Sequence, residues 1–435
     1  MLTPYFLGRK HTPRRRFLGR KHTLRPEQHS RVGAIGLAML ATLLSTGLAI
    51  AAVPGPSARA DQVRDAQSWV LAMLRAQAAW TVSQGAGVKV AVIDSGVDAH
   101  VSDLTGSVIP GPDYTGAGTT PSNLHWGQHG TWMASLIAGH GHNGGGDGIM
   151  GMAPKSRVLS IRVITDPGDP GYRRYQHEPT ARIQQSLATA ITYAVTHGAG
   201  VISMSIGYGG PSRPVRSALQ YAYDHNVVVV ASAGNSGKPS RAHAPYTFPA
   251  DYPGVIGVSA VNESAHAAGF SSDNLSVLVA APGVQVPAQG RDGAYWLVSG
   301  TSPACALTAG VAALIRSAYP GLPASLVTTA ITASTRDRPR GGYDDKVGFG
   351  VVDAAAALTA ARKLAGDPPA ARAGLASAMH FGGGPSAIPP APVVKRGPGL
   401  LILFALLAFT SLTLIIVAVT RLAVLRRFRP GQQSE

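Results

Sequence analysis

The chain alternates continuous apolar runs of strand length with stretches of helical periodicity, and this alternation limits the folds open to it. The apolar runs cover residues 88–93, 157–164, 200–207, 227–235 and 254–260. Between them, residues 181–196 and 213–225 carry apolar side chains at helical spacing. A strand that is apolar at every position is typical of a parallel sheet buried on both faces. We therefore expect an α/β fold in which a central, mostly parallel sheet is flanked by helices.

Polar residues with catalytic chemistry lie next to several of these runs. In parallel sheets, functional groups collect at the carboxyl ends of the strands. Asp94 ends the first run, and His129 and Ser302 each come just before an apolar helical stretch. A carboxylate, an imidazole and a hydroxyl at one edge of a sheet are the groups that acyl transfer requires. Other residues expected at this edge are Ser205, Gly207 and Asn235.

Each of these residues, taken alone, also has a structural interpretation. Ser302 is suited to capping the helix that follows it. Asp94 and Asn235 both precede glycine-containing turns, where such residues are common. His129 is compatible with an exposed position on a helix. The structural interpretation needs four separate roles that happen to reproduce one ordered catalytic pattern. A single active site explains the four residues more simply.

Four segments resemble, in the same order, the signature blocks of subtilisin-like serine proteases. They are VAVIDSGVD around Asp94, HGTWMASLIAG around His129, ASAGNSG around Asn235 and SGTSPACALTAGVAAL around Ser302, and the similarity spans residues 78–358. The resemblance implies the subtilisin α/β fold and serine endopeptidase activity. It implies that Ser302 is the nucleophile, that His129 is its general base and then acid, and that Asp94 orients the imidazole. It also implies that Asn235 stabilises the oxyanion together with the Ser302 backbone N–H.

The same resemblance implies a substrate cleft. One side would be a strand along which an extended substrate binds by main-chain pairing. The other side would be the wall of the pocket for the residue before the cleaved bond, where small side chains predict an open apolar pocket. The matching strand residues are Ser205, Ile206 and Gly207, and the matching wall residues are Ala231, Ser232 and Ala233.

The chain departs from the pattern of these proteases around two of its blocks. Trp126-Gly127-Gln128 stands where they usually carry an acidic residue shortly before the histidine block. Pro303 directly follows the nucleophile, and Ala306 stands where they carry a proline. A proline in the first helical turn is compatible with the helix. Altered packing beneath Ser302 can nevertheless displace its hydroxyl, and a displacement of about 1 Å is costly for catalysis.

Three further features have simple interpretations. Phe248-Pro249 stands where these proteases carry a cis peptide, whereas a trans bond is the ordinary state of a loop proline. The chain has a single cysteine, Cys305, which excludes an internal disulfide and reads as a small buried side chain rather than a second nucleophile. The glycines of GHGHNGGGDG predict a flexible loop, so we expect no metal site there and no cofactor. The candidate ligands in that loop are His140, His142 and Asp147.

The formal net charge of +16 is unevenly distributed along the chain. Residues 1–60 carry ten Lys or Arg and one Glu, a net charge of +9. The rest of the chain shows no basic stripe interleaved with aromatic residues, so we expect no nucleic-acid partner. We interpret residues 1–60 as a basic region and a signal peptide, because the uncharged run 32–53 precedes Ala58 and Ala60 in a small-x-small cleavage pattern. An uncleaved anchor at 32–53 and twin-arginine export through RRRFLG at 14–19 stay alternatives.

The C-terminal part predicts a membrane anchor. Residues 399–420 form an uncharged apolar run long enough for a transmembrane helix, and residues 421–435 form a basic tail. The positive-inside rule places this tail in the cytoplasm and the preceding domain outside the cell membrane. Residues 61–87 and 365–398 are then an N-terminal extension and a Pro/Gly-rich stalk on either side of a catalytic domain at 88–364.

This order of segments resembles that of the mycosins, the membrane-anchored proteases of actinobacterial type VII secretion systems. The resemblance implies exported proteins as substrates and membrane components of the secretion machinery as partners. Two alternatives stay open. One is a structural subunit that braces a membrane complex with weak or dispensable catalysis, and the other is a membrane-tethered protease unconnected to secretion.

Overall fold

The computed structural model describes residues 62–237, 243–366, 409–418 and 420. The expected signal peptide at 1–60, almost all of the expected stalk at 365–398 and the tail at 421–435 lie outside these residues. The chain forms two units, Met1–Pro369 and Ala370–Glu435. In the second unit, residues 409–418 are helical, and the rest of the predicted transmembrane run is almost entirely undescribed. Within the described residues, no helix combines the length and the apolar character needed to cross a bilayer.

The first unit is built on a seven-stranded sheet in which every neighbouring pair is parallel. Its order is β2-β5-β1-β6-β7-β8-β9. Each of the five predicted apolar runs contains one of these strands, to within one residue at the end of the strand, which confirms the central parallel sheet of an α/β fold. The strands, in sheet order, are Val108–Asp113, Arg157–Arg162, Lys89–Asp94, Val201–Met204, Val228–Ser232, Val255–Val261 and Val277–Pro282.

Two strands of this sheet have no counterpart among the predicted runs. β2 contains Pro110, Gly111 and Pro112, which disfavour a strand, and it is tolerated because it lies at the edge of the sheet, where it pairs on one side only. β9 is a six-residue run at the opposite edge. A short apolar run of this kind does not distinguish a strand from a helical segment.

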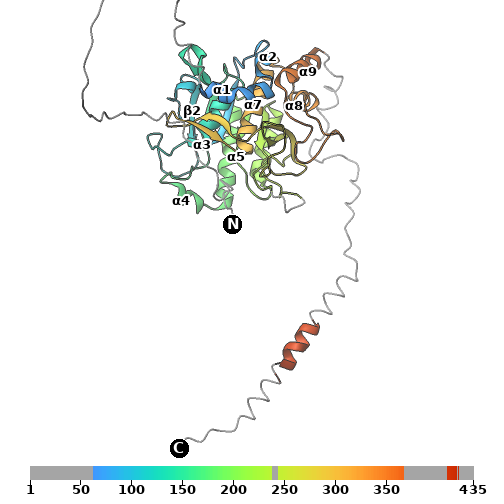
Figure 1. Ribbon diagram of the computed structural model, residues 1–435. Helices are drawn as coiled ribbons and strands as arrows, with labels where there is room; N and C mark the ends of the chain where they lie inside the picture. The colour runs from blue at the N-terminus through green and yellow to red at the C-terminus, as the bar shows by residue number, and fades with distance from the viewer. Residues whose placement is uncertain (1–61, 238–242, 367–408, 419, 421–435) are drawn as a thin grey trace, which may run out of the picture. The chain divides into compact units, whose positions relative to one another are not determined.

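Helices cover both faces of the sheet, because alternate residues of each strand point to opposite sides. Val90 and Val92 of β1 pack in the core under α3 (Gln128–Ala138) and α7 (Thr301–Ala318). Ala91 and Ile93 pack in a second core under α5 (Thr180–Thr196) and α6 (Arg213–Asp224). The predicted helical stretches 181–196 and 213–225 are therefore confirmed as α5 and α6. Figure 1 shows α1, α2 and α9 together at one side of this unit and α4 and α5 at the opposite side of the view.

The N-terminal extension packs on the body as two helices. α1 (Gln62–Met73) and α2 (Ala76–Trp80) meet at Arg75, which adopts a left-handed conformation with φ 53°. Residues 62–80 therefore form two helices and not one continuous helix. Gln67 fixes α1 by two hydrogen bonds to the backbone of Met150, and Trp80 donates to the Met152 carbonyl. The remaining helical segments are η1 (Ser102–Leu104), η2 (Asn143–Gly145), α4 (Tyr172–Gln176), α8 (Ala324–Ala333) and α9 (Ala354–Gly366).

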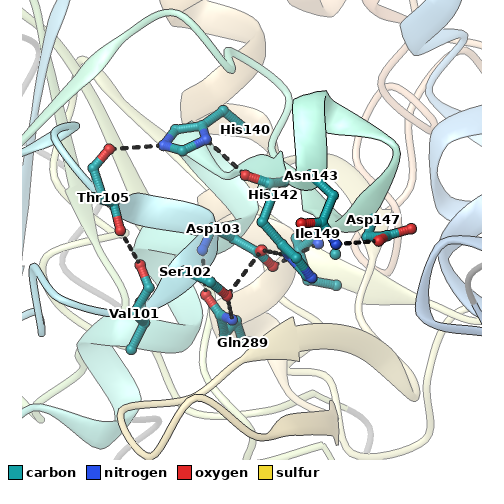
Figure 2. Close-up of polar contacts among 12 residues, drawn as sticks. Val101, Ser102, Asp103, Thr105, His140, His142, Asn143, Asp147, Ile149 and Gln289 are labelled. Carbon is teal, nitrogen blue, oxygen red and sulfur yellow. Dashed lines mark hydrogen bonds and ion pairs between the residues drawn. The ribbon is translucent and has the colours of Figure 1, made fainter.

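Two antiparallel hairpins complete the unit. β10 (Val286–Gln289) pairs with β11 (Tyr295–Val298), and β3 (His140–His142) pairs with β4 (Asp147–Met150). The second hairpin corrects the prediction of a flexible loop over residues 139–148. Asp103 holds this hairpin, because its carboxylate accepts hydrogen bonds from the Ile149 backbone N–H and from His142 Nδ1 (Figure 2). The glycines allow the tight backbone that the hairpin needs, and Asp103 supplies the order that glycine composition alone does not predict.

Candidate active site

Asp94 and His129 form a buried pair at the carboxyl edge of the sheet. Asp94 is the last residue of β1, and His129 is the second residue of α3. The Asp94 Oδ1 atom lies 2.8 Å from His129 Nδ1, with exposed side-chain fractions of 1% and 12%, respectively. Asp94 Oδ1 also accepts the Ser95 backbone N–H at 2.7 Å. This geometry fixes the imidazole orientation and leaves Nε2 as the nitrogen for proton exchange.

The surroundings of His129 favour its charged form. Burial lowers the pKa of His129, but the Asp94 carboxylate, its hydrogen bond and the carboxylate of Asp166 outweigh burial and raise the pKa above its ordinary value. An imidazole with a raised pKa is a better proton acceptor. The arrangement is therefore suited to a general base whose protonated form is stabilised as it appears.

Ser302 lies in the first turn of α7, next to the end of β6. Its hydroxyl donates to the Ser205 carbonyl at 3.4 Å, and the Ser205 hydroxyl donates to the Ser302 carbonyl at 3.1 Å. The helix begins after Gly300, and its described N-terminus has no side-chain cap. The alternative that Ser302 is a helix cap is therefore wrong, because its hydroxyl bonds across to the neighbouring strand end.

Asn235 and the first residues of α7 enclose a space lined by two N–H donors. The Thr301 N–H and hydroxyl both donate to Asn235 Oδ1, at 2.9 and 3.1 Å, which directs the Nδ2 end of the amide away from Thr301. A Cβ atom added to Gly300 would lie 3.3 Å from Asn235 Nδ2 and 3.7 Å from the Ser302 backbone nitrogen. The absence of a side chain at Gly300 thus leaves a position where one oxygen atom can approach both donors. Two donors near one such position are what an oxyanion site requires.

The residues predicted for the substrate cleft lie on two neighbouring strands. Ser205, Ile206 and Gly207 directly follow β6, and the register pairs Met204 of β6 with Ala231 of β7. Ala231 is packed in the core beneath α5 and α6, and Ser232 and Ala233 are also buried. The two chain segments therefore run side by side to the same edge of the sheet as Asp94. The Phe248–Pro249 peptide opposite Tyr208 is cis.

The substitutions around Ser302 are accommodated by the helix. Pro303 and Ala306 are buried in α7, whose first turn forms with proline in place, as the sequence predicted. Cys305 is fully buried, and burial raises the pKa of its thiol to about 12. The thiol therefore stays protonated near neutral pH, which confirms it as a packed side chain and excludes a thiolate nucleophile at this position.

Sequence reasoning missed Asp166, which lies beyond the end of β5. Its carboxylate accepts the backbone N–H groups of Gln128 and His129 at 2.7 and 3.2 Å. An acidic residue just after a central parallel strand was the signal that identified Asp94, and the same signal at the end of the run 157–164 could have identified Asp166. Among the described residues, no group of three or more His, Cys, Asp or Glu is arranged to hold a metal ion.

Comparisons with known proteins show the family of the chain. The model of the Subtilase family matches residues 85–350, more than half of the chain, so the chain belongs to the subtilase family. Thermitase from Thermoactinomyces vulgaris is 35% identical over 268 residues, which are 62% of this chain and 88% of thermitase. Mycosin-1 from Mycobacterium tuberculosis is 36% identical over 317 residues, which are 63% of this chain and 69% of mycosin-1.

A solved structure shows the same likeness. MycP1, a serine protease described as an essential component of the type VII (ESX-1) secretion system, aligns with a TM-score of 0.57 and 34% identity over 67% of this chain and 88% of MycP1. The family match and these relatives assign the chain to the subtilisin-like serine endopeptidases and confirm its similarity to the mycosins.

Proposed function

We propose that the chain cleaves peptide bonds through an acyl-enzyme formed on Ser302, with His129 and Asp94 completing the catalytic triad. The observation that carries this proposal is the 2.8 Å pair between Asp94 and His129 at the same sheet edge as Ser302. Asp94 holds Nδ1–H of the imidazole, so that Nε2 is the atom that takes the hydroxyl proton of Ser302. The freed oxygen attacks the substrate carbonyl.

The same groups complete acylation and then carry out deacylation. The negative charge on the carbonyl oxygen is stabilised by Asn235 Nδ2 and the Ser302 N–H, and collapse of the intermediate breaks the C–N bond. His129 gives its proton to the departing amine, which leaves an ester on Ser302. Water then loses a proton to His129 as its oxygen bonds to the ester carbonyl carbon. Collapse of this second intermediate breaks the C–O bond to Ser302 and releases the acid, and the proton on His129 returns to the Ser302 oxygen.

A serine-directed fluorophosphonate probe tests this mechanism on the full chain in detergent. We expect labelling of the wild type and none of Ser302→Ala, and strongly slowed labelling of His129→Ala. Ser317→Ala is the matched control, because Ser317 lies in the same helix and its hydroxyl bonds to the Ala86 carbonyl. Labelling that persists in Ser302→Ala would contradict the assignment of the nucleophile.

A structural subunit with dispensable catalysis is the second candidate. The observation in its favour is the unusual packing next to the nucleophile, where Pro303 and Ala306 replace the residues of active subtilisin-like proteases. This candidate predicts a folded wild-type chain that neither reacts with the probe nor hydrolyses peptides. The same labelling experiment therefore separates the two functions.

The proposal extends to the location of the enzyme. The apolar run 399–420, the basic tail 421–435 and the export signal expected in 1–60 support a single-pass protein of the cell membrane with its catalytic domain outside the cytoplasm. Protease added to intact cells should then digest the catalytic domain and spare an epitope tag on the tail. Protection of both parts would contradict this orientation.

The similarity to MycP1 and mycosin-1 supports a role in type VII secretion. We propose exported proteins as substrates and membrane components of that machinery as partners. Copurification from detergent-solubilised membranes, followed by mass spectrometry, should recover such components with the tagged chain. Recovery of the chain alone would favour a protease unconnected to secretion.

A further inference from the structure

Asp166 contacts the first turn of the helix that carries His129. We propose that Asp166 is a positioning residue for His129, because its carboxylate fixes the start of α3 and places a second negative charge near the imidazole. The proposal rests on the proposed role of His129 as general base. It adds a fifth polar side chain to the proposed machinery of Asp94, His129, Ser302 and Asn235, and this one acts through His129 and does not touch the substrate.

The start of α3 needs an acceptor that its own sequence does not supply. The first N–H groups of a helix have no partner within the helix. Here the preceding residue is Gly127, which has a left-handed backbone (φ 76°) and no side chain to cap the helix. Asp166 fills this role from 37 residues away, with its two carboxylate oxygens on the N–H groups of Gln128 and His129. The backbone of His129 is thereby tied to β5 as well as to its own helix.

Asp166 lies in a turn that several contacts surround. Its carbonyl accepts the Asp169 N–H at 3.1 Å. The buried Arg162 guanidinium pairs with Asp169 at 2.6 Å and with Asp113 at 2.5 Å, and it lies over the Trp126 ring, 5.5 Å from its centre. Because Trp126 directly precedes the turn that starts α3, Arg162 anchors both segments that meet at Asp166. The carboxylate is therefore held in place before any substrate binds.

The charges around Asp166 couple it to the catalytic pair. Burial raises the pKa of Asp166 to about 6, with the Asp94 carboxylate acting in the same direction and His129 acting against it. The Asp166 carboxylate in turn helps raise the pKa of His129. Other charged groups near this turn are Arg162, which pairs with Asp113 and Asp169, His125, which lies against Gly168, and Arg291, which donates to the Trp126 carbonyl. The imidazolium of His129 thus forms in the field of two carboxylates.

Two substitutions in the full chain separate the charge of Asp166 from its size. Asp166→Asn keeps the shape but removes the charge, so the imidazolium of His129 loses a favourable interaction. We expect the acidic limb of kcat/KM to move to lower pH by about one unit, and kcat on the plateau to fall by about tenfold to a hundredfold while KM changes little. Asp166→Glu keeps the charge, so its limb should stay within about 0.3 units of the wild type even where kcat falls.

Asp103→Asn is the matched control, because Asp103 is also a fully buried carboxylate that accepts a backbone N–H and pairs with a histidine (Figure 2). Its histidine is His142, which has no part in the proposed mechanism. We expect this variant to unfold more easily than the wild type but to keep the wild-type pH profile. A shift of its acidic limb equal to that of Asp166→Asn would show a general effect of buried charge and would overturn the proposal.

The remaining outcomes are also decisive. Asp166→Asn with an unmoved limb and kcat within about twofold of the wild type overturns the positioning role. If Asp166→Asn does not fold, the pH profile of Asp166→Glu tests the proposal instead. An acidic limb of kcat/KM that moves by a full pH unit in Asp166→Glu, despite the retained charge, also overturns the positioning role. A wild type that is inert to peptides and to the fluorophosphonate probe would instead refute the proposed function, which is a different result from an active enzyme with an unresponsive Asp166.

Discussion

At the scale of single residues, the proposed oxyanion site depends on how the side-chain amide of Asn235 is anchored. Thr301 occupies the carbonyl end of Asn235 with two hydrogen bonds, so the nitrogen end faces the space beside Gly300. Donors that are oriented before the reaction stabilise the transition state without reorganisation. Asn235 should therefore contribute to the chemical step more than to substrate binding.

Asn235→Ala tests this contribution. We expect kcat to fall by about a hundredfold to a thousandfold, because one preorganised donor to the oxyanion is lost, and KM to change little. Peptide hydrolysis under saturating conditions measures the effect. Asn274→Ala is the control, since Asn274 is a buried asparagine that bonds to Ser276 and to the Pro245 carbonyl. It should lose stability and keep kcat, and an equal loss of kcat in both variants would contradict the oxyanion role.

The catalytic residues differ in how visible they are in the sequence. Asp94, His129, Asn235 and Ser302 each stand beside an apolar run, so the rule that functional groups collect at strand ends predicts them together. Asp166 also follows an apolar run, but the sequence does not show that its partners are the backbone N–H groups of residues 37 and 38 positions away. The sequence also does not decide whether Ser302 caps its helix, since a serine at a helix start can bond either to its own helix or to a neighbouring strand.

At the scale of elements, Arg162 joins the last residue of β5 to the loops around it. Its guanidinium donates to Asp113, Asp169 and the Ser95 carbonyl, and the side chain is 1% exposed. Removal of one partner of a buried ion pair leaves the other charge without compensation. The stability of this edge of the sheet should therefore depend on Arg162 far more than on surface ion pairs.

Arg162→Ala should lower the free energy of unfolding by about 3 to 5 kcal/mol. Denaturant unfolding followed by circular dichroism measures the change. Arg182→Ala is the matched control, because Arg182 pairs with Glu178 at 3.1 Å on the surface and is 57% exposed. Its cost should stay below about 1 kcal/mol. Similar losses in the two variants would show that burial of the Arg162 pairs does not matter.

The N-terminal helix depends on a second buried polar contact. Gln67 is fully buried and bonds to both the N–H and the carbonyl of Met150, at 3.0 and 2.8 Å. Gln67→Ala should cost about 2 kcal/mol of unfolding free energy, because two backbone groups lose their partner. Gln77→Ala, at an exposed position of α2, should be nearly neutral. Thermal unfolding compares them, and equal melting temperatures would contradict this role of Gln67.

Elements were predictable where the apolar pattern was long and pure. β1, β5, β6, β7 and β8 lie inside continuous apolar runs to within one residue at their ends, because each strand is covered on both faces. β2 was missed because its prolines and glycine are tolerated only at an edge, which the sequence does not mark. The hairpin of β3 and β4 was taken for a loop because its order comes from Asp103, a residue that precedes it by nearly forty positions.

At the scale of the whole molecule, the proposed role of Asp166 predicts a conflict between activity and stability. Burial raises the pKa of Asp166 from 3.8 to about 6. A carboxyl with a raised pKa binds its proton more tightly in the folded chain than in the unfolded chain. Its contribution to stability is thus complete below about pH 4 and is lost as the pH rises through about 6. At neutral pH, the folded enzyme keeps a charge that costs stability.

Asp166→Asn removes this titration and should therefore change how stability depends on pH. The difference in unfolding free energy between the variant and the wild type should rise by about 3 kcal/mol from about pH 3 to pH 7. This value corresponds to the rise of about two units in the pKa of Asp166, at about 1.4 kcal/mol for each unit. Denaturant unfolding of both full chains across this range measures the difference. A gain in stability at neutral pH in the variant that loses activity would show that the charge is kept for catalysis. A difference that stays constant with pH would mean that Asp166 does not carry the raised pKa.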